Sequence, residues 1–376
     1  MIEVREVKTR KERKEFLTFP LKLYKGHDCF VPPLYGDEKK IFKADYVYYD
    51  TCEAVYFNAY KDGKIVGRIS GILQKASNEK MGQKRVRFTR FDSINDQEVA
   101  NQLFRTLEEW AISKEMDTIC GPLGFSDLER EGLLIEGFEH LATFEEQYNY
   151  DYYKTLIENC GYEKEVDWVE SKLMLPPDDN GKLKKATEQV MEKHNLHFST
   201  EKRIGKFIKK YADDFFNLLD QGYENIYGTV PFTENMKKLL LSNFKLLLGT
   251  KYISMILDEN ENPVCMGMCI PSIAKAVQKS GGKLTPPCLI KILKAKRNPE
   301  YIDLALIAVD KQYINKGVAL CFIPELMRMV EESEITKWIE TNLNLETNIP
   351  IQNMWKRFEA ENHKRRRSFV KTLAIE

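Results

Sequence analysis

The stretch DLALIAVDKQYINKGVALCFI, residues 303–323, decides the fold of the second half of the chain. Its first seven residues form an apolar run of strand length, its middle is polar, and a second apolar run opens at Gly317. Free backbone N–H groups at a helix start attract anions, and a glycine there lets a ligand approach the backbone closely. The stretch predicts a strand, a loop and a helix, and the loop is either a phosphate site or an ordinary turn in which Gly317 serves packing.

Working outward, two hairpins are predicted at matching places in the two halves. Apolar residues 54–60 and 65–72 flank Asp62-Gly63, and residues 251–257 and 264–270 flank a longer polar turn. Asp-Gly between apolar runs is a strong hairpin signal. The hairpin starts differ by 251 − 54 = 197 residues, and helices expected from 151 and 348 also differ by 348 − 151 = 197. The shared offset predicts an internal duplication of one α/β unit.

The boundary between the copies is the turn-forming run Pro176-Pro177-Asp178-Asp179-Asn180-Gly181. We predict an N-terminal domain over residues 1–176, a linker helix within residues 177–195 and a C-terminal domain over residues 196–376. The second domain is expected to hold a helix over 317–332, a strand over 335–343, a helix over 348–361 and a last strand over 367–375.

Composition excludes several classes of protein. The 376 residues carry 57 Lys plus Arg against 57 Asp plus Glu, so any nucleic-acid or membrane partner would need a local patch. Neither a spanning apolar segment nor a signal peptide is expected, and nucleic acid is not favoured as a partner. The eight cysteines form no CxxC pair and the five histidines no metal-binding pair, so we expect reduced thiols, no metal, no membrane partner and a cytoplasmic location.

Two groups of polar or aromatic residues leave two interpretations open, and a third has one. The basic run Lys364-Arg365-Arg366-Arg367 either grips phosphate or forms a solvated strand edge. The basic residues of 291–297 are interpreted as the polar face of a helix that ends before Pro299. The tyrosines of 46–49 and 148–153 either line an acceptor pocket or pack half-buried between the domains.

The motif VDKQYINKGVA at 309–319, in this order of elements, resembles the acyl-CoA N-acyltransferases of the GNAT superfamily. Nearly the whole chain resembles bacterial tandem-GNAT proteins of uncharacterised substrate, through FVPPL (30–34), YKDGKIVGR (60–68), GPLGF (121–125), IEGF (135–138), PSIAKAVQK (271–279) and HKRRR (363–367). The resemblance implies an α/β (α+β) fold of two tandem GNAT-like domains, each a mixed, mostly antiparallel sheet flanked by helices.

The resemblance also implies a donor site in the second domain, for acetyl-CoA or another acyl-CoA. The family signature Gln/Arg-x-x-Gly-x-Gly/Ala falls on 314–319, where Gly317 and Ala319 match and Ile314 does not. The first domain has no glycine between Phe91 and Asp96 and is expected to be degenerate for CoA. The implied cofactor-binding residues are Ile307, Val309, Ile314, Asn315, Lys316, Gly317, Val318, Ala319 and Asn348.

Catalysis is predicted from fewer residues. Many members of the superfamily protonate the leaving thiolate with a tyrosine hydroxyl, and the corresponding position here is Trp355, with Ile157 in the first half. Glu340 and Asn342, which alternate along one strand, are the candidates for the general base, with Glu340 preferred, and Tyr227 is the candidate general acid. A packing or solvated role is the alternative for each.

The predicted function is an N-acyltransferase that transfers an acyl group from acyl-CoA to a small-molecule or peptide amine between the domains. One alternative is a catalytically weakened tandem-GNAT module that binds a ligand or a protein. Another is an aminoacyl transferase of the Fem type. The oligomeric state, the acyl group and the acceptor do not follow from the sequence.

Overall fold

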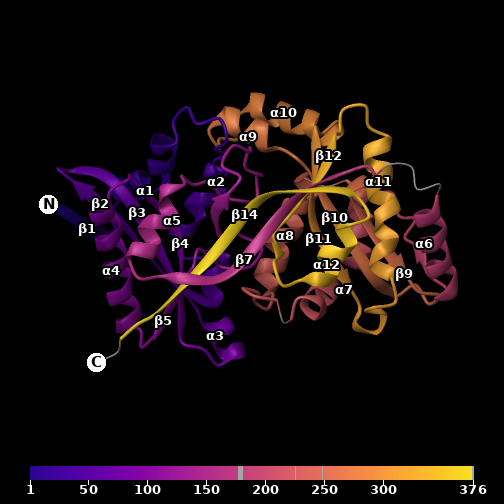
Figure 1. The fold of residues 1–376 in the computed structure, drawn as a ribbon, viewed down its shortest axis with the longest axis horizontal. Coiled ribbons are helices and arrows are strands. Elements are labelled where there is room, and N and C mark those ends of the chain that lie inside the picture. The colour runs from indigo at the N-terminus through magenta and orange to yellow at the C-terminus, as the bar shows by residue number, and fades with distance from the viewer. Residues whose placement is uncertain (177–180, 225, 248, 375–376) are drawn as a thin grey trace. The chain divides into compact units, whose positions relative to one another are not determined.

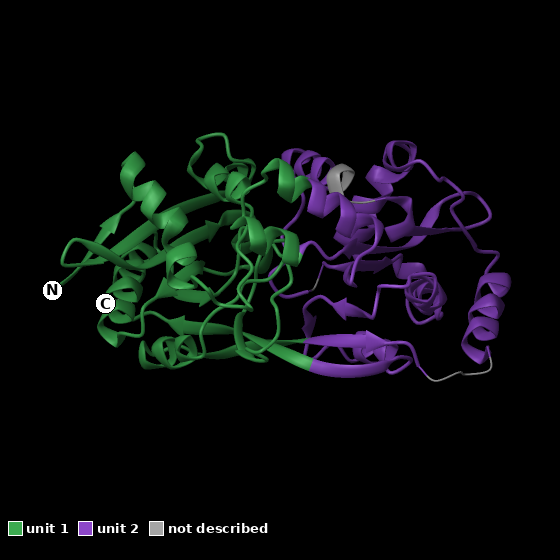
Figure 2. Ribbon diagram, turned by 90° about the horizontal axis from the view of Figure 1, so that it is seen from above, with its two compact units in different colours: residues 1–169, 274–289, 363–376 green, residues 170–273, 290–362 purple. Residues whose placement is uncertain are grey.

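The computed structural model describes residues 1–176, 181–224, 226–247 and 249–374 (Figure 1). The chain forms two compact units (Figure 2). Unit 1 comprises residues 1–169, 274–289 and 363–376, and unit 2 comprises residues 170–273 and 290–362. No helix of the described ranges is both long and apolar enough to cross a bilayer.

Unit 1 is built on a mostly antiparallel sheet in the order β1-β2-β3-β4-β5-β14, with β6 beside β14. Among the described strand pairs of this sheet, β4–β5 is parallel and the others are antiparallel. The hairpin predicted around Asp62-Gly63 is confirmed, since both residues have positive φ in the turn between β2 and β3. The elements are β1 (Ile2–Glu6), α1 (Arg10–Leu23), α2 (Tyr35–Glu38), β2 (Cys52–Lys61), β3 (Lys64–Gln74), α3 (Lys75–Met81), β4 (Arg85–Ser93), α4 (Gln97–Ser113), β5 (Thr118–Gly121), β6 (Leu133–Glu136), α5 (Tyr152–Asn159) and α9 (Ala274–Ser280).

Unit 2 repeats this arrangement on a sheet in the order β12-β11-β10-β9-β8. Of its strand pairs in the described ranges, β11–β12 is parallel and the others are antiparallel. The predicted second hairpin is confirmed as β9 and β10. The elements are α6 (Lys182–Lys193), β8 (His197–Phe198), α7 (Ile204–Gly222), α8 (Glu234–Leu247), β9 (Ile253–Leu257), β10 (Pro263–Pro271), β11 (Tyr301–Val309), the 3₁₀ turn η5 (Val318–Phe322), α11 (Ile323–Glu331), β12 (Trp338–Thr341), β13 (Asn344–Leu345) and α12 (Ile349–Trp355). Helix α10 (Pro286–Arg297) begins with residues of unit 1 and ends with residues of unit 2.

The last strand of each half contributes to the unit formed mainly by the other half. Strand β7 (Glu163–Met174) begins in unit 1, and its Lys172 and Leu173 pair with β12 in unit 2. Strand β14 (Glu359–Thr372) begins in unit 2, and its residues 369–372 pair with β5 in unit 1. The contiguous domain ranges expected from the sequence and the compact units therefore differ at these two strands, and also at residues 274–289, which belong to unit 1.

Three local expectations need correction. The helix expected over 317–332 opens as the 3₁₀ turn η5, and its α-helical part begins at Ile323. Pro324 explains this break, because it has no N–H to continue an α-helix from Gly317. The helix expected over 348–361 ends at Trp355, and the final strand begins at Glu359 instead of Arg367.

The predicted linker helix is α6, and it packs on unit 2. Its Val190 and Met191 lie against a buried cluster that includes Val318, Cys321 and Phe322. Apolar side chains on one face of a helix favour such docking over a solvated linker.

The basic run at 364–367 is not a solvated edge. Lys364 and Arg366 are buried in β14, and the Arg367 guanidinium donates to both carboxylate oxygens of Asp167 at 2.8 and 3.0 Å. Arg365 donates to the same carboxylate at 3.3 Å. The run therefore stabilises the interior of unit 1.

We predict that Phe369→Ala destabilises unit 1 selectively. Phe369 is fully buried and lies opposite Gly121 in the sheet of unit 1. Removing a buried phenyl ring lowers the free energy of unfolding by about 3–5 kcal/mol. Hydrogen exchange should accelerate at residues 118–121, whereas exposed Thr372→Ala on the same strand should change little. Acceleration at residues 253–309 with unchanged exchange at 118–121 would contradict the assignment of this strand to unit 1.

Candidate functional site

The strand β11 separates from its neighbour β12 halfway along its length. Its register with β10 slips by one residue at Ala305, because Met268 faces Leu306 while Cys269 faces Leu304. On the other side, pairing with β12 reaches only Leu304, whose carbonyl accepts from the Asn342 N–H at 3.2 Å. A bulge of this kind bends a strand and ends its pairing, and bulges are frequent beside active sites.

Beyond the bulge, β11 presents an open backbone edge. The Asp310 N–H donates to the Val264 carbonyl at 2.8 Å, which fixes the alternation of the antiparallel ladder. The N–H and C=O groups of Ile307 and Val309 therefore point away from β10. Within the described ranges β12 does not pair alongside them, and only the Tyr223 hydroxyl reaches this edge, donating to the Ile307 carbonyl at 3.2 Å.

The loop that follows β11 presents further free amides. Asn315 and Gly317 adopt left-handed backbone conformations, with φ of 63° and 81°. The Leu320 N–H donates to the Gly317 carbonyl at 3.1 Å and closes the first turn of η5. The N–H groups of Asn315, Gly317, Val318 and Ala319 have no acceptor among the residues that the structure describes. Successive free N–H groups in a left-handed turn form an anion-binding concavity.

Two lysine side chains near this loop carry positive charge, and their contacts hold them only weakly. Lys311 pairs with Glu224 at 2.7 Å, and both side chains are about half exposed. The Lys316 ammonium lies 4.9 Å from the centre of the Tyr313 ring. Exposed pairs of this kind hold their partners weakly, so both lysines can turn toward an incoming anion. Ile314 is half exposed and offers no polar side chain.

The two predicted catalytic residues occupy different environments. Glu340 is buried on β12, where its carboxylate accepts from the Trp338 indole N–H at 3.2 Å. Tyr227 lies half-buried in the turn that follows α7. Trp355 is buried in α12 and donates its indole N–H to the Asn344 side chain, so it supplies no acidic hydroxyl.

The predicted cofactor-binding residues lie on two elements, β11 with its following loop and the start of α12. Ile307 and Val309 lead directly into the loop 314–319, as the sequence indicates. Asn348 is the N-cap of α12, and its side-chain oxygen accepts from the Ile351 N–H at 3.4 Å. Tyr223 was missed, and its signal in the sequence was its position directly after α7.

Unit 1 contains the equivalent edge, but its own tyrosines occupy it. The Ile94 N–H donates to the Val66 carbonyl at 3.0 Å, which turns the backbone of Ser93 away from β3. The Ser93 N–H donates to the Tyr153 hydroxyl at 3.0 Å, and the Tyr152 hydroxyl donates to the Ser93 carbonyl at 2.8 Å. Both backbone groups that a ligand would need are therefore satisfied internally.

The helix after this edge is also unsuited to an anion. Its N-cap is Asp96, whose carboxylate accepts from the Glu98 N–H at 3.1 Å. Two acidic side chains at a helix N-terminus compete with a phosphate for the same N–H groups. These contacts support the prediction that this unit is degenerate for CoA.

Unit 1 instead holds a pocket of about 250 Å³, lined by several charged side chains, beside the bulge in β4. Its walls include the ion pair between Arg68 and Asp92, at 2.8 Å, and the pair between Arg90 and Glu38, at 3.1 Å. The Tyr24 hydroxyl, at the end of α1, donates to Asp92 at 3.1 Å. Tyr24 thus occupies the place in unit 1 that Tyr223 occupies at the end of α7 in unit 2.

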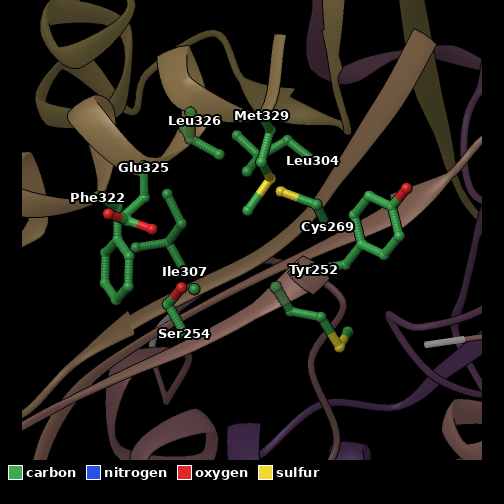
Figure 3. A pocket seen from close by; sticks show the side chains of 11 residues that line it. Tyr252, Ser254, Cys269, Leu304, Ile307, Phe322, Glu325, Leu326 and Met329 are labelled. Carbon is green, nitrogen blue, oxygen red and sulfur yellow. The ribbon is translucent and has the colours of Figure 1, made fainter. Parts of the chain in front are cut away.

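On unit 2 a small apolar pocket of about 10 Å³ lies between the sheet and α11 (Figure 3). Cys269 and Met329 both line it, with Leu304 and Ile307 from β11. Burial, reinforced by the nearby Asp303 carboxylate, raises the pKa of the Cys269 thiol to about 12. No cluster of three metal-ligating side chains occurs within the described part of the chain.

No family model matches the chain. The sequence is 27% identical to Protein YghO of Escherichia coli (strain K12), over 98% of this chain and 95% of that protein. It is 23% identical to the "Bacterial ceramide synthase" of Caulobacter vibrioides, over 78% of this chain and 76% of that protein.

Among solved structures, the model matches a tandem GNAT protein from the clavulanic acid biosynthesis pathway, solved without AcCoA. The TM-score is 0.57 at 11% identity, and the match covers 100% of both chains. The chain has the tandem GNAT fold. A GCN5-related N-acetyltransferase from Sphaerobacter thermophilus matches with a TM-score of 0.51 at 10% identity, over 99% of this chain and 95% of that one. The predicted fold class, two GNAT-like units of α/β build, is confirmed.

We predict that Cys269 does not react in the folded GNAT unit. A thiol with a pKa of about 12 leaves about one molecule in 10⁴ as thiolate at pH 8. Iodoacetamide at pH 8 should therefore leave Cys269 unmodified in peptide mass spectra, and should modify it after unfolding in guanidinium chloride. Rapid modification of the native protein would contradict this and would make Cys269 a candidate nucleophile.

Proposed function

We propose that the chain is an acyl-CoA-dependent N-acyltransferase whose unit 2 binds the acyl-CoA. The observation that carries the proposal is the outward-facing backbone of Ile307 and Val309, followed by the free N–H groups of Asn315, Gly317, Val318 and Ala319. Pantetheine is a chain of amides and can add to a strand edge as a peptide does. The pyrophosphate of CoA fits the free N–H groups of the loop in the same way as other phosphates at glycine-containing turns.

The proposed roles follow from this placement. Ile307 and Val309 hydrogen-bond the pantetheine arm, and the backbone of 314–319 holds the pyrophosphate, with Lys316 adding charge. Ile314 replaces the polar residue of the family signature, so the backbone carries this contact alone. Asn348 begins α12, and we propose that this helix lies on the other side of the thioester.

The proposed reaction is direct attack of an amine on the thioester carbonyl. The C–N bond forms as the C–S bond breaks, the amine nitrogen loses a proton, and the thiolate gains one. Glu340 is the proposed base, directly or through a water, and Tyr227 is the proposed acid. Backbone N–H groups near the end of β11 are the proposed donors to the oxyanion.

The proposed acceptor is an amine, and the name of one relative indicates which class of amine to test first. A ceramide is the amide of a fatty acid with a long-chain amino alcohol, and the name of the Caulobacter vibrioides relative therefore favours a long-chain amine. An acceptor screen should include sphinganine beside polyamines, amino acids and peptides, each with acetyl-CoA and with palmitoyl-CoA.

A second candidate is a binding module that retains the CoA site without transfer. The buried Trp355 favours it, because this position lacks the hydroxyl that many GNAT enzymes use. Release of CoA thiol in the acceptor screen distinguishes the two, since a binding module releases none.

Gly317→Asp should abolish binding of acetyl-CoA in calorimetry while the protein stays folded. The new carboxylate repels the pyrophosphate, and its Cβ would lie 3.5 Å from the Val190 side chain, an ordinary contact. Gly317→Asn is the matched control, because asparagine tolerates the left-handed backbone and adds no charge. We expect the Asn variant to bind within about tenfold of the original affinity. Unchanged affinity in the folded Asp variant would move the site elsewhere.

Tyr227→Phe and Tyr223→Phe should separate catalysis from binding. Loss of a general acid lowers turnover by about 10²–10⁴-fold, so Tyr227→Phe should lower kcat and spare CoA affinity.

Tyr223→Phe removes the hydroxyl that occupies the Ile307 carbonyl, so a pantetheine N–H can use that carbonyl and CoA should bind about 2–10-fold tighter. Full turnover in Tyr227→Phe would remove that residue from the mechanism. Weaker CoA binding in Tyr223→Phe would show that this hydroxyl contacts the ligand.

A further inference from the structure

The excursion between β10 and β11 concentrates positive charge on a chain whose net charge is zero. Between Glu261 and Glu300 the sequence has no acidic residue. Seven basic residues occur there: Lys275, Lys279, Lys283, Lys291, Lys294, Lys296 and Arg297. A local cluster of one sign attracts an oppositely charged surface even when the whole molecule is neutral.

Helix α10 (orange in Figure 1) lies within this excursion. It exposes a stripe of apolar side chains. Leu289, Ile290 and Leu293 are 38%, 67% and 57% exposed. Cys288 and Ile292, one turn apart, are buried and hold the helix against the protein. Residues at spacings of three and four lie side by side on a helix, so the three exposed side chains form one continuous stripe.

Cations border this stripe. Lys294 and Arg297 follow Ile290 at the i+4 and i+7 positions, and both are exposed, as is Lys291. Leu284, just before the helix, adds a further apolar side chain that is 43% exposed. The helix therefore presents aliphatic and cationic groups on a single outer surface, which is the pattern of helices that lie in a bilayer interface.

We propose that α10 binds the surface of an anionic lipid bilayer. Leu289, Ile290 and Leu293 enter the boundary between headgroups and acyl chains, and the flanking lysines and arginine lie near lipid phosphates. The helix has 12 residues and is too short to span a bilayer. A nucleic acid would use the cations but leave the aliphatic stripe in water, and a second copy of the chain would bring the same positive charges together.

This inference does not depend on the acyltransferase proposal. It revises the expectation of no membrane partner, which rested on the missing spanning segment and the zero net charge. The basic residues of 291–297 were interpreted from the sequence as the polar face of a helix, and the structure adds the exposed apolar side chains beside them.

The test is co-sedimentation of the full chain with sucrose-loaded vesicles. One set is phosphatidylcholine alone, and the other contains one quarter phosphatidylglycerol. We expect partitioning to be at least about tenfold higher on the anionic vesicles and to fall as salt is raised. Ile290→Gln with Leu293→Gln should lower it about tenfold, and so should Lys291→Gln with Lys294→Gln and Arg297→Gln.

Two matched controls come from the same chain. Met81→Gln with Ile112→Gln removes apolar side chains that are 56% and 42% exposed elsewhere, and Lys182→Gln with Lys184→Gln and Lys185→Gln removes three exposed lysines of α6. Neither control should change partitioning, and all variants should keep the circular dichroism of the original chain. Absent binding to anionic vesicles, or equal loss in the controls, would overturn the proposal. If only the variant of Lys291, Lys294 and Arg297 lost partitioning, the protein would bind the vesicles by charge alone and the insertion of the apolar stripe would be contradicted. If the chain formed dimers without vesicles, and Ile290→Gln with Leu293→Gln abolished them, the stripe would instead bind a second copy of the chain.

Discussion

Every backbone N–H and C=O group must find a hydrogen-bond partner, and the separation of β11 from β12 leaves several without one. The pairing stops at Leu304, and the bulge at Ala305 turns the following residues away from β12. This edge can be satisfied by water, by the protein or by a ligand. The architecture of unit 2 keeps it open, apart from the Tyr223 hydroxyl at Ile307, and places a loop of further free amides directly after it.

Unit 1 has the equivalent strand edge, but there the protein's own side chains bond the backbone groups. Tyr152 and Tyr153 bond both backbone groups of Ser93, and the next helix begins at an aspartate where unit 2 has Gly317. A charged pocket remains beside the bulge in β4, held by ion pairs of Arg68 and Arg90. The duplicated fold therefore holds one edge that the protein closes itself and one that suits a ligand made of amides and phosphate.

Local patterns in the sequence predict much of this fold. The hairpin at Asp62-Gly63 and the strand 301–309 depend on turn residues and apolar runs that act over a few positions. The exchange of β7 and β14 could not be predicted, because each strand alternates in the same way whichever sheet receives it. Pro324 was present in the sequence and explains the 3₁₀ start of the helix after Gly317. Tyr223 and the exposed stripe of α10 depend on what packs nearby, which periodicity does not reveal.

The central claim is that acyl-CoA binds to unit 2 along β11 and its following loop. Hydrogen exchange with and without saturating acetyl-CoA tests it most directly, because the amides in question are the proposed contacts. We expect slower exchange at Ile307, Val309 and residues 315–319, and unchanged exchange at residues 91–98 of unit 1. Protection at 91–98 in place of 307–319, or no protection at all under saturating acetyl-CoA and palmitoyl-CoA, would contradict the account.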